Sequence, residues 1–224
     1  MISVAEPVPG PGVGEVLRRA VRDFYEESWR LVLLNSALSA YVLIVLAIAA
    51  YSPLALLLLV GVGPLAAMLV SAAVIIVETG SLTFVETAQG LHRCWKRGLV
   101  LGATVALGAI ATVTAFRFYG RLGSAAWPLA VLVLYLAGIF CLYQLLLWPY
   151  AVRSCRRPLR EAAAEAGVEL VHRPWAVTRL GLALLAVNLL GLVAAVLPLL
   201  TMTIAYSALA AARFALSPVP LEEH

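Results

Sequence analysis

Six long apolar stretches that are almost free of charge constrain this chain more than any other feature of its sequence. A helix needs about 20 apolar residues to cross a hydrocarbon core roughly 30 Å thick. We predict that each stretch forms one membrane span, at residues 31–51, 54–77, 99–116, 127–150, 180–197 and 199–216. The predicted fold class is therefore all-α, a polytopic membrane helix bundle of six transmembrane helices.

The composition supports this class and excludes two others. Of the 224 residues, 63% are hydrophobic and 12% are charged, and the mean hydropathy is +0.98. A soluble domain of this length could not bury so much apolar surface, and a disordered chain would be richer in charge. The arginines fall between apolar runs and not in one stripe, so we expect the lipid bilayer as partner and no nucleic acid.

Two span boundaries stay open at this point. Gly61, Gly63 and Pro64 interrupt the second stretch, so that they either kink the helix or mark its start, with the helix continuing past Glu78. The last two spans follow each other without a polar loop. One straight helix over 180–216 would be about 55 Å long, too long for a bilayer. A turn at Pro198 therefore favours six spans over five.

The basic residues predict the orientation. We place four segments on the cytoplasmic side: the N-terminal segment 1–30, the loops 78–98 and 151–179, and the tail 217–224. Of the 16 basic residues, only Arg117 and Arg121 then lie on the outer side of the membrane. This bias is what the positive-inside rule expects of a protein with both termini in the cytoplasm, here in a bacterial inner membrane. The five tryptophans also lie near predicted interfaces, at Trp29, Trp95, Trp127, Trp148 and Trp175.

Two cytoplasmic segments have amphipathic helical spacing. The first has an apolar side formed by Leu17, Val21, Phe24 and Ser28. The second begins at Pro158, and its apolar side consists of Leu159, Ala163, Ala166 and Leu170. Its polar side includes Glu169, which is placed to pair with Arg173 four residues on. Such helices either lie on the membrane surface as connectors or dock a cytoplasmic partner.

Polar residues within the predicted spans are few. The amides Asn35, Gln144 and Asn188 are expected to make interhelical polar contacts, or alternatively to line a polar pathway. Arg213 lies close enough to a span end to extend its guanidinium to the interface. Gly98 and Gly102 form a GxxxG pattern, which marks close helix packing.

The sequence offers no catalytic chemistry. Glu78 and Glu86 lie at or beyond a span end, as solvated charges or as functional groups. The three cysteines, Cys94, Cys141 and Cys155, have an odd count and no CxxC pair, so we expect neither a disulfide framework nor a zinc site. No HExxH, GxSxG or phosphate-binding glycine loop is present. We predict no enzyme activity, no metal site and no cofactor.

Four segments carry a resemblance to a known family. These are WRLVLLNSALSAY from Trp29, GPLAAMLVSAA from Gly63, GLHRCWKRGLVLG from Gly90 and REAAAEAGVELVHRP from Arg160. Together they make the chain similar to the YesL-like family of small bacterial six-span membrane proteins, although Ser36 and Ala37 stand where that family often has an aromatic residue. The resemblance implies an association with carbohydrate-uptake systems and assigns no catalytic residues.

A second resemblance concerns one short motif. Glu161, Ala162 and Ala163 with Gly167 resemble the coupling loop of ABC-type importer permeases, which implies docking to an ATPase subunit. The Ile-x-Leu-Pro that follows in those permeases is absent. The sequence therefore favours a non-enzymatic accessory or scaffold for a carbohydrate-uptake transporter, and the alternative is a transport component, either a small-solute transporter or an ABC-type permease subunit.

Overall fold

A computed structural model describes residues 12–51, 58, 60–122, 126–155, 157–194 and 202–216. Within these residues the structure is helical and contains no strand. The helices are α1 (Val13–Glu26), α2 (Ser28–Ala49), α3 (Val62–Thr79), α4 (Phe84–Arg121), α5 (Trp127–Arg153), α6 (Leu159–His172), α7 (Pro174–Ala194) and α9 (Ile204–Leu216). The all-α class predicted from the sequence is confirmed.

Five of these helices are long and apolar enough to cross a membrane. The candidate spans are Trp29–Ile48, Val62–Thr79, His92–Arg121, Trp127–Arg153 and Pro174–Val193. α9 is apolar but has 13 residues, which corresponds to about 20 Å of helix. The predicted turn at Pro198 lies outside the described residues.

The second and third predicted spans have different bounds in the structure. α3 begins at Val62, so the glycine-proline segment marks a helix start, and residues 54–57 of the expected span lie outside the described residues. Within the expected cytoplasmic loop 78–98, α4 begins at Phe84 and runs without a break through 38 residues to Arg121. No proline interrupts that sequence, and a helix tolerates its glycines at a modest cost in free energy.

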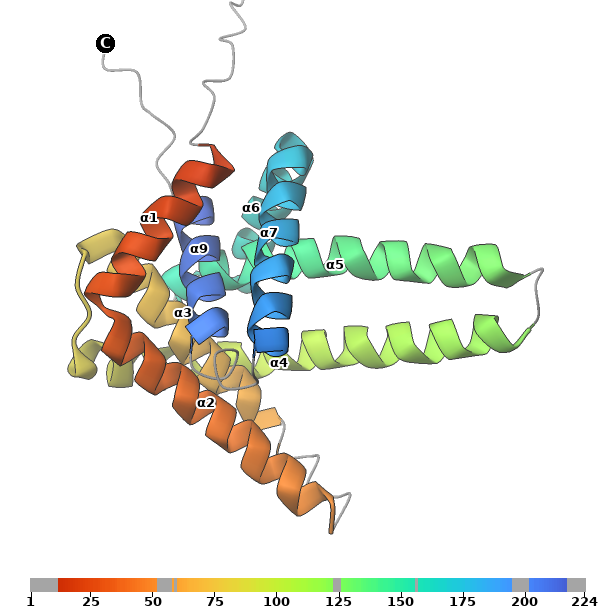
Figure 1. Cartoon of the computed structure of the whole chain (residues 1–224), viewed down its shortest axis with the longest axis horizontal. Coiled ribbons are helices and arrows are strands. Elements are labelled where there is room, and N and C mark those ends of the chain that lie inside the picture. The colour runs from red at the N-terminus through yellow and green to blue at the C-terminus, as the bar shows by residue number, and fades with distance from the viewer. Residues whose placement is uncertain are drawn as a thin grey trace, which may run out of the picture.

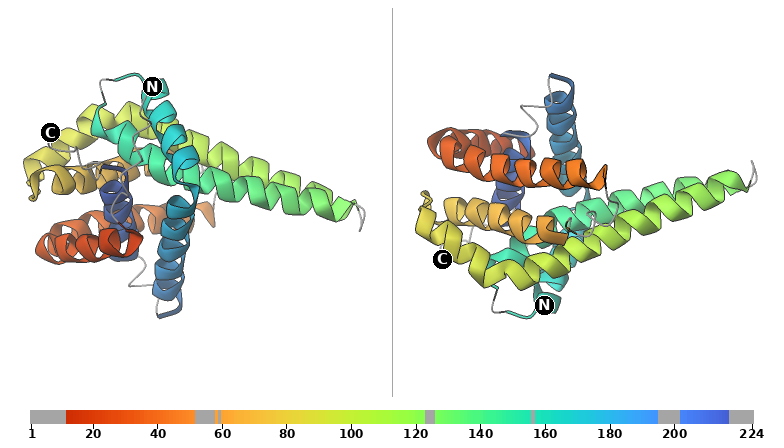
Figure 2. Two further views of the ribbon diagram at one scale, coloured as in Figure 1. Left: turned by 90° about the horizontal axis from the view of Figure 1, so that it is seen from above. Right: turned by 90° about the horizontal axis from the view of Figure 1, so that it is seen from below.

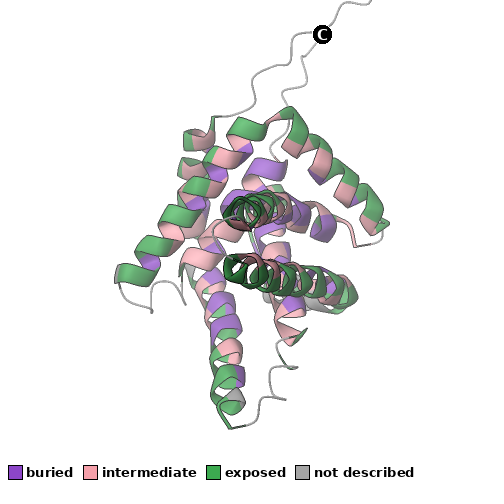
Figure 3. Cartoon of the chain, turned by 90° about the vertical axis from the view of Figure 1, so that its right-hand side faces the viewer, coloured by how far each residue is buried: buried purple, intermediate pink, exposed green. Residues whose placement is uncertain are grey.

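α3 occupies the centre of the bundle and contacts α2, α4, α5 and α9. Beyond this core, α4 and α5 run side by side as a hairpin that projects from the other helices (Figures 1 and 2). The view along the hairpin shows exposed residues around it (Figure 3). Many are large and apolar, including Leu107, Ile110, Val131, Tyr135 and Leu136. So much apolar surface is stable in hydrocarbon and not in water, as expected of a membrane-embedded protein.

The GxxxG pattern marks a close helix crossing, as predicted. A Cβ placed on Gly98 would lie 2.7 Å from the Cα of Pro64, and one on Gly102 would lie 2.8 Å from the Cα of Gly63. The backbones of α3 and α4 therefore touch at Gly63, Gly98 and Gly102. The sequence showed the pair on α4, whereas the partner glycine on α3 is visible only in the structure.

α1 packs against α9, and its buried side overlaps the predicted one in part, because Leu17 and Phe24 are half-buried against the core and the side chain of Ser28 lies outside the described residues. Val16, Ala20 and Asp23 are buried, whereas Val21 is exposed. The observed buried side of α1 is therefore rotated from the predicted apolar side toward Asp23. The reason is an ion pair: Arg213 Nε of α9 donates to Asp23 Oδ2 at 2.7 Å. Arg213 thus binds a carboxylate of the N-terminal segment, and its extension to the interface stays a prediction.

Candidate functional site

The helix that the sequence singles out for docking, α6, has boundaries set by two prolines. Pro158 precedes it with a φ of −62° and extended ψ, which suits the residue before a helix. The body is rich in alanine, the best helix former. α6 ends at His172 because Pro174 restricts the backbone of Arg173 and opens α7.

α6 packs its small residues against α5. Ala162 and Ala166 are buried, Ala163 is half-buried, and the hydroxyl of Tyr143 on α5 donates to the Ala163 carbonyl at 3.2 Å. The expected pair between Glu169 and Arg173 is present, with 3.5 Å between Arg173 Nη1 and Glu169 Oε1.

The four residues of the coupling-loop motif do not share one side of α6. Glu161 is exposed, whereas Ala162 is covered by the bundle. Gly167 is half-buried and faces open space, because a Cβ there would have no heavy atom within 4 Å. Of the predicted docking set, Glu161 and Gly167 are therefore available to a partner, and Ala162 is not.

The exposed side of α6 forms a stripe that we call the outer stripe, made of Glu161, Glu165, Val168 and His172. These residues recur about once per helical turn and therefore align along one line. Val168 is 56% exposed. Arg157 lies beside the stripe, with its Nη1 3.6 Å from Glu165 Oε1. The outer stripe thus combines the carboxylates of Glu161 and Glu165 with the exposed apolar side chain of Val168.

The connection between α5 and α6 is held by Arg97 of α4. Its Nη1 donates to the carbonyls of Ala151 and Ser154, both at 2.7 Å, and its Nη2 donates to the carbonyl of Arg157. A guanidinium at this position satisfies carbonyls that the end of α5 leaves without a partner. Sequence reasoning counted Arg97 only as a cytoplasmic charge and missed this contact.

A disulfide joins the same two segments, and the expectation of no disulfide is wrong. Cys94 of α4 and Cys155 after α5 are bonded, with 5.6 Å between their Cα atoms and a sequence separation of 61. The packing of α4 on α5 brings them together, which no local spacing rule could detect. Cys141 is free and exposed.

The three amides predicted at membrane depth are all shielded to some degree. Asn188 Nδ2 donates to the Leu184 carbonyl and to Ser207 Oγ of α9, both at 2.8 Å. Asn35 is fully buried in α2. Gln144 is 8% exposed on α5, and its Oε1 accepts no hydrogen bond from the described residues. Asn188 thus makes an interhelical polar contact between α7 and α9, as expected.

Of the two acidic residues expected near the end of the second span, the structure describes the side chain of Glu78. Arg153 Nε donates to Glu78 Oε1 at 2.8 Å, and both side chains are exposed. The side chain of Glu86 lies outside the described residues. Glu78 therefore joins α3 to the end of α5 as a surface ion pair.

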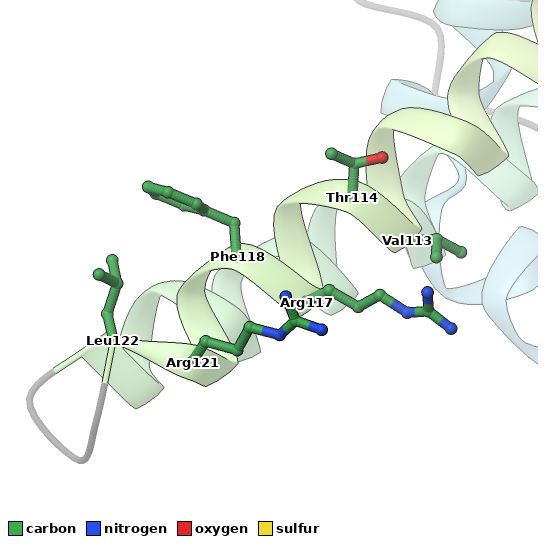
Figure 4. A pocket seen from close by; sticks show the side chains of 6 residues that line it. All are labelled: Val113, Thr114, Arg117, Phe118, Arg121 and Leu122. Carbon is green, nitrogen blue, oxygen red and sulfur yellow. The ribbon is translucent and has the colours of Figure 1, made fainter.

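A hollow lies near the tip of the α4–α5 hairpin (Figure 4). Its lining comes entirely from α4 and consists of Val113, Thr114, Arg117, Phe118, Arg121 and Leu122. The two guanidinium groups extend from the same side of the helix, and Phe118 lies on the neighbouring side (Figure 4). The sequence marked these arginines only by their predicted location outside the cell.

The described part of the chain contains no group of three or more metal-ligating side chains. Comparison with family models, with curated proteins and with solved structures gives no match. Any function must therefore be argued from the surfaces and contacts above.

Proposed function

We propose that the chain is a non-enzymatic integral membrane protein that acts as a docking scaffold for a transporter through the outer stripe of α6. The observation that carries the proposal is the division of α6 into a buried alanine side and an exposed stripe that includes Val168. The buried side fixes the helix on the bundle. The exposed side is then presented in a defined orientation, as partner recognition by a helix requires.

The location is part of the proposal. Six spans with both termini in the cytoplasm of a bacterial cell would place α6 inside, because 14 of the basic residues would then lie on that side and Arg117 and Arg121 on the other. The resemblance to the YesL-like family extends the proposal to a carbohydrate-uptake transporter as partner.

A permease subunit is the second candidate. α6 lies between α5 and α7, two candidate spans, which is the place of a coupling helix in ABC-type importers. In that case Glu161 and Gly167 would contact an ATPase subunit directly, while Ala162 and Ala163 would hold the helix on α5.

Affinity purification in a mild detergent, followed by quantitative mass spectrometry, tests both candidates. We expect a transporter subunit at fixed stoichiometry with the native chain and its loss in Val168→Asp, where an exposed side chain changes without loss of core packing. Val21→Asp is the matched control, because Val21 is also exposed but lies on α1. An ATPase as the directly bound subunit would favour the permease; equal partner recovery from both variants, or no transporter subunit at all, would contradict docking through α6.

A further inference from the structure

Two arginines at the tip of the α4–α5 hairpin lie far from any acidic side chain of their own segment. Arg117 and Arg121 are both exposed and lie one helical turn apart. They line the hollow of about 480 Å³ shown in Figure 4. Like charges at this spacing repel each other and destabilise the helix unless an anion compensates them.

The sequence around the hairpin provides no such anion. No aspartate or glutamate occurs between Glu86 and Glu161, a stretch that includes all of α5 and the connection to it. In the described residues, other arginines do have carboxylate partners, namely Arg19, Arg30, Arg153, Arg157, Arg173 and Arg213. Since the tip projects away from those acids (Figure 1), an anion that compensates both arginines would come from outside the chain.

The surroundings indicate the depth of this site. Below the tip, the hairpin exposes large apolar side chains such as Ile110 and Leu136, which belong in hydrocarbon. Trp127, 53% exposed, opens α5 at the same end of the hairpin. Tryptophan is enriched where hydrocarbon meets the headgroups. The arginines therefore lie at the level of lipid phosphates.

The side chains are arranged in two adjacent lines along α4. One line, at four-residue spacing, ends in Arg117 and Arg121, and the other contains Thr114, Phe118 and Leu122. A basic line beside a mostly apolar line matches an amphiphile with a negatively charged end.

We propose that Arg117 and Arg121 bind the phosphate of an anionic phospholipid, whose acyl chains extend from there toward the hydrocarbon along the exposed side chains of Val113 and Ile110. Guanidinium groups bind phosphate oxygens through paired, charge-assisted hydrogen bonds. A lipid with net negative charge compensates both arginines better than a zwitterionic one, because the latter brings its own cation. The exposed apolar side chains next to the arginines favour a lipid over free phosphate.

Native mass spectrometry of the detergent-solubilised protein tests the site. The chain is titrated with dioleoyl phosphatidylglycerol or with dioleoyl phosphatidylcholine. We expect phosphatidylglycerol to bind at least about tenfold more tightly, because both lipids offer a phosphate but the choline cation of phosphatidylcholine repels the two arginines. The variant Arg117→Gln with Arg121→Gln should lose that preference.

The control removes the same charge elsewhere. Arg18 and Arg22 are also exposed and one turn apart, on α1 beside Glu15, so Arg18→Gln with Arg22→Gln should keep the preference. Equal loss in both double variants would show an effect of net charge, and no loss in either would place the lipid elsewhere. Displacement of bound phosphatidylglycerol by inorganic phosphate would identify a free-anion site. Each of these results would overturn the proposal.

Discussion

Glycine residues determine how closely α3 and α4 approach each other. Gly63, Gly98 and Gly102 let the two backbones touch, because a Cβ at any of them would overlap the facing helix. In lipid, helices associate through such packing, since burial of apolar surface from water provides little driving force. The contact of these three residues is therefore a main determinant of the bundle's geometry.

Gly98→Ala should destabilise the protein by about 1–3 kcal/mol, the usual cost of overpacking. The added methyl would meet the Pro64 Cα and Ala67 Cβ at 2.7 and 2.9 Å, and neither can move freely. Gly138→Ala is the control, because that position on α5 is open, and the better helix propensity of alanine should leave stability unchanged or raise it by up to about 1 kcal/mol. Detergent-denaturation curves measure both; equal shifts would contradict the backbone contact.

The ion pair between Asp23 and Arg213 is the second position at which one residue matters. Their side chains are 7% and 21% exposed, so removal of one partner leaves a shielded charge without its counter-charge. We expect Arg213→Met or Asp23→Leu alone to cost about 2–4 kcal/mol, and the double variant to recover part of the loss. A double-mutant cycle measures the coupling. The exposed pair Glu15–Arg19 should give at most about 1 kcal/mol in the same cycle, and similar couplings would contradict the difference in burial.

At the scale of elements, a disulfide and the hydrogen bonds of one arginine join α4 to the connection between α5 and α6. The Cys94–Cys155 bond fixes the connection after α5 to α4, and Arg97 holds the carbonyls of the same connection. The orientation of α6 on α5 therefore depends on residues at the start of the candidate span of α4, His92–Arg121. The polar start of α4 is a structural element and not a loose loop.

Loss of the disulfide should lower stability by at most about 4 kcal/mol, the chain-entropy value for a closed loop of this length. The true effect is expected to be smaller, because spans that stay in the bilayer already restrict the unfolded chain. Thermal melting of Cys94→Ser with Cys155→Ser measures it, and Cys141→Ser, at a free exposed cysteine, should melt like the native chain. If the double variant melted unchanged, the bond would contribute nothing to holding α4 on α5.

Local features of the chain were predictable from the sequence, and contacts between distant segments were not. α5 and α7 follow from runs of apolar residues, and the two-sided character of α6 follows from its spacing. The ion pair of Asp23 with Arg213 spans 190 residues, and nothing near either residue signals the other. Such pairs depend on tertiary packing.

At the scale of the whole molecule, the ion pair also bears on the number of spans. Asp23 precedes the first candidate span, and Arg213 lies in the last turn of α9. In the predicted topology this contact lies at one face of the membrane, which requires an even number of crossings. Five long helices alone give an odd number. We therefore keep six spans as the prediction, with α9 as part of the sixth.

The disulfide points to a different compartment from the one that the arginines indicate. Most basic residues favour the cytoplasm for the α6 end of the molecule, whereas a stable disulfide is typical of oxidising compartments. If the α6 end is cytoplasmic, Cys94 and Cys155 should be thiols in growing cells and should oxidise after lysis. Rapid alkylation of intact cells, followed by mass spectrometry, measures this state. A fully oxidised pair would contradict the cytoplasmic placement.

Single cysteines in a chain that lacks Cys94, Cys141 and Cys155 determine the topology directly. With six spans and both termini inside, a cysteine at Ser124, between α4 and α5, should react with a membrane-impermeant maleimide applied from outside. Cysteines at Ala164 on α6 and at Ser217 after α9 should react only after the membrane is opened, because even crossings return the chain to the starting side. Labelling of Ser217→Cys from outside, with Ala164→Cys protected, would mean five spans and would separate Arg213 from Asp23. Labelling of Ala164→Cys with protection of Ser124→Cys would reverse the orientation, and α6 could then not dock a cytoplasmic partner.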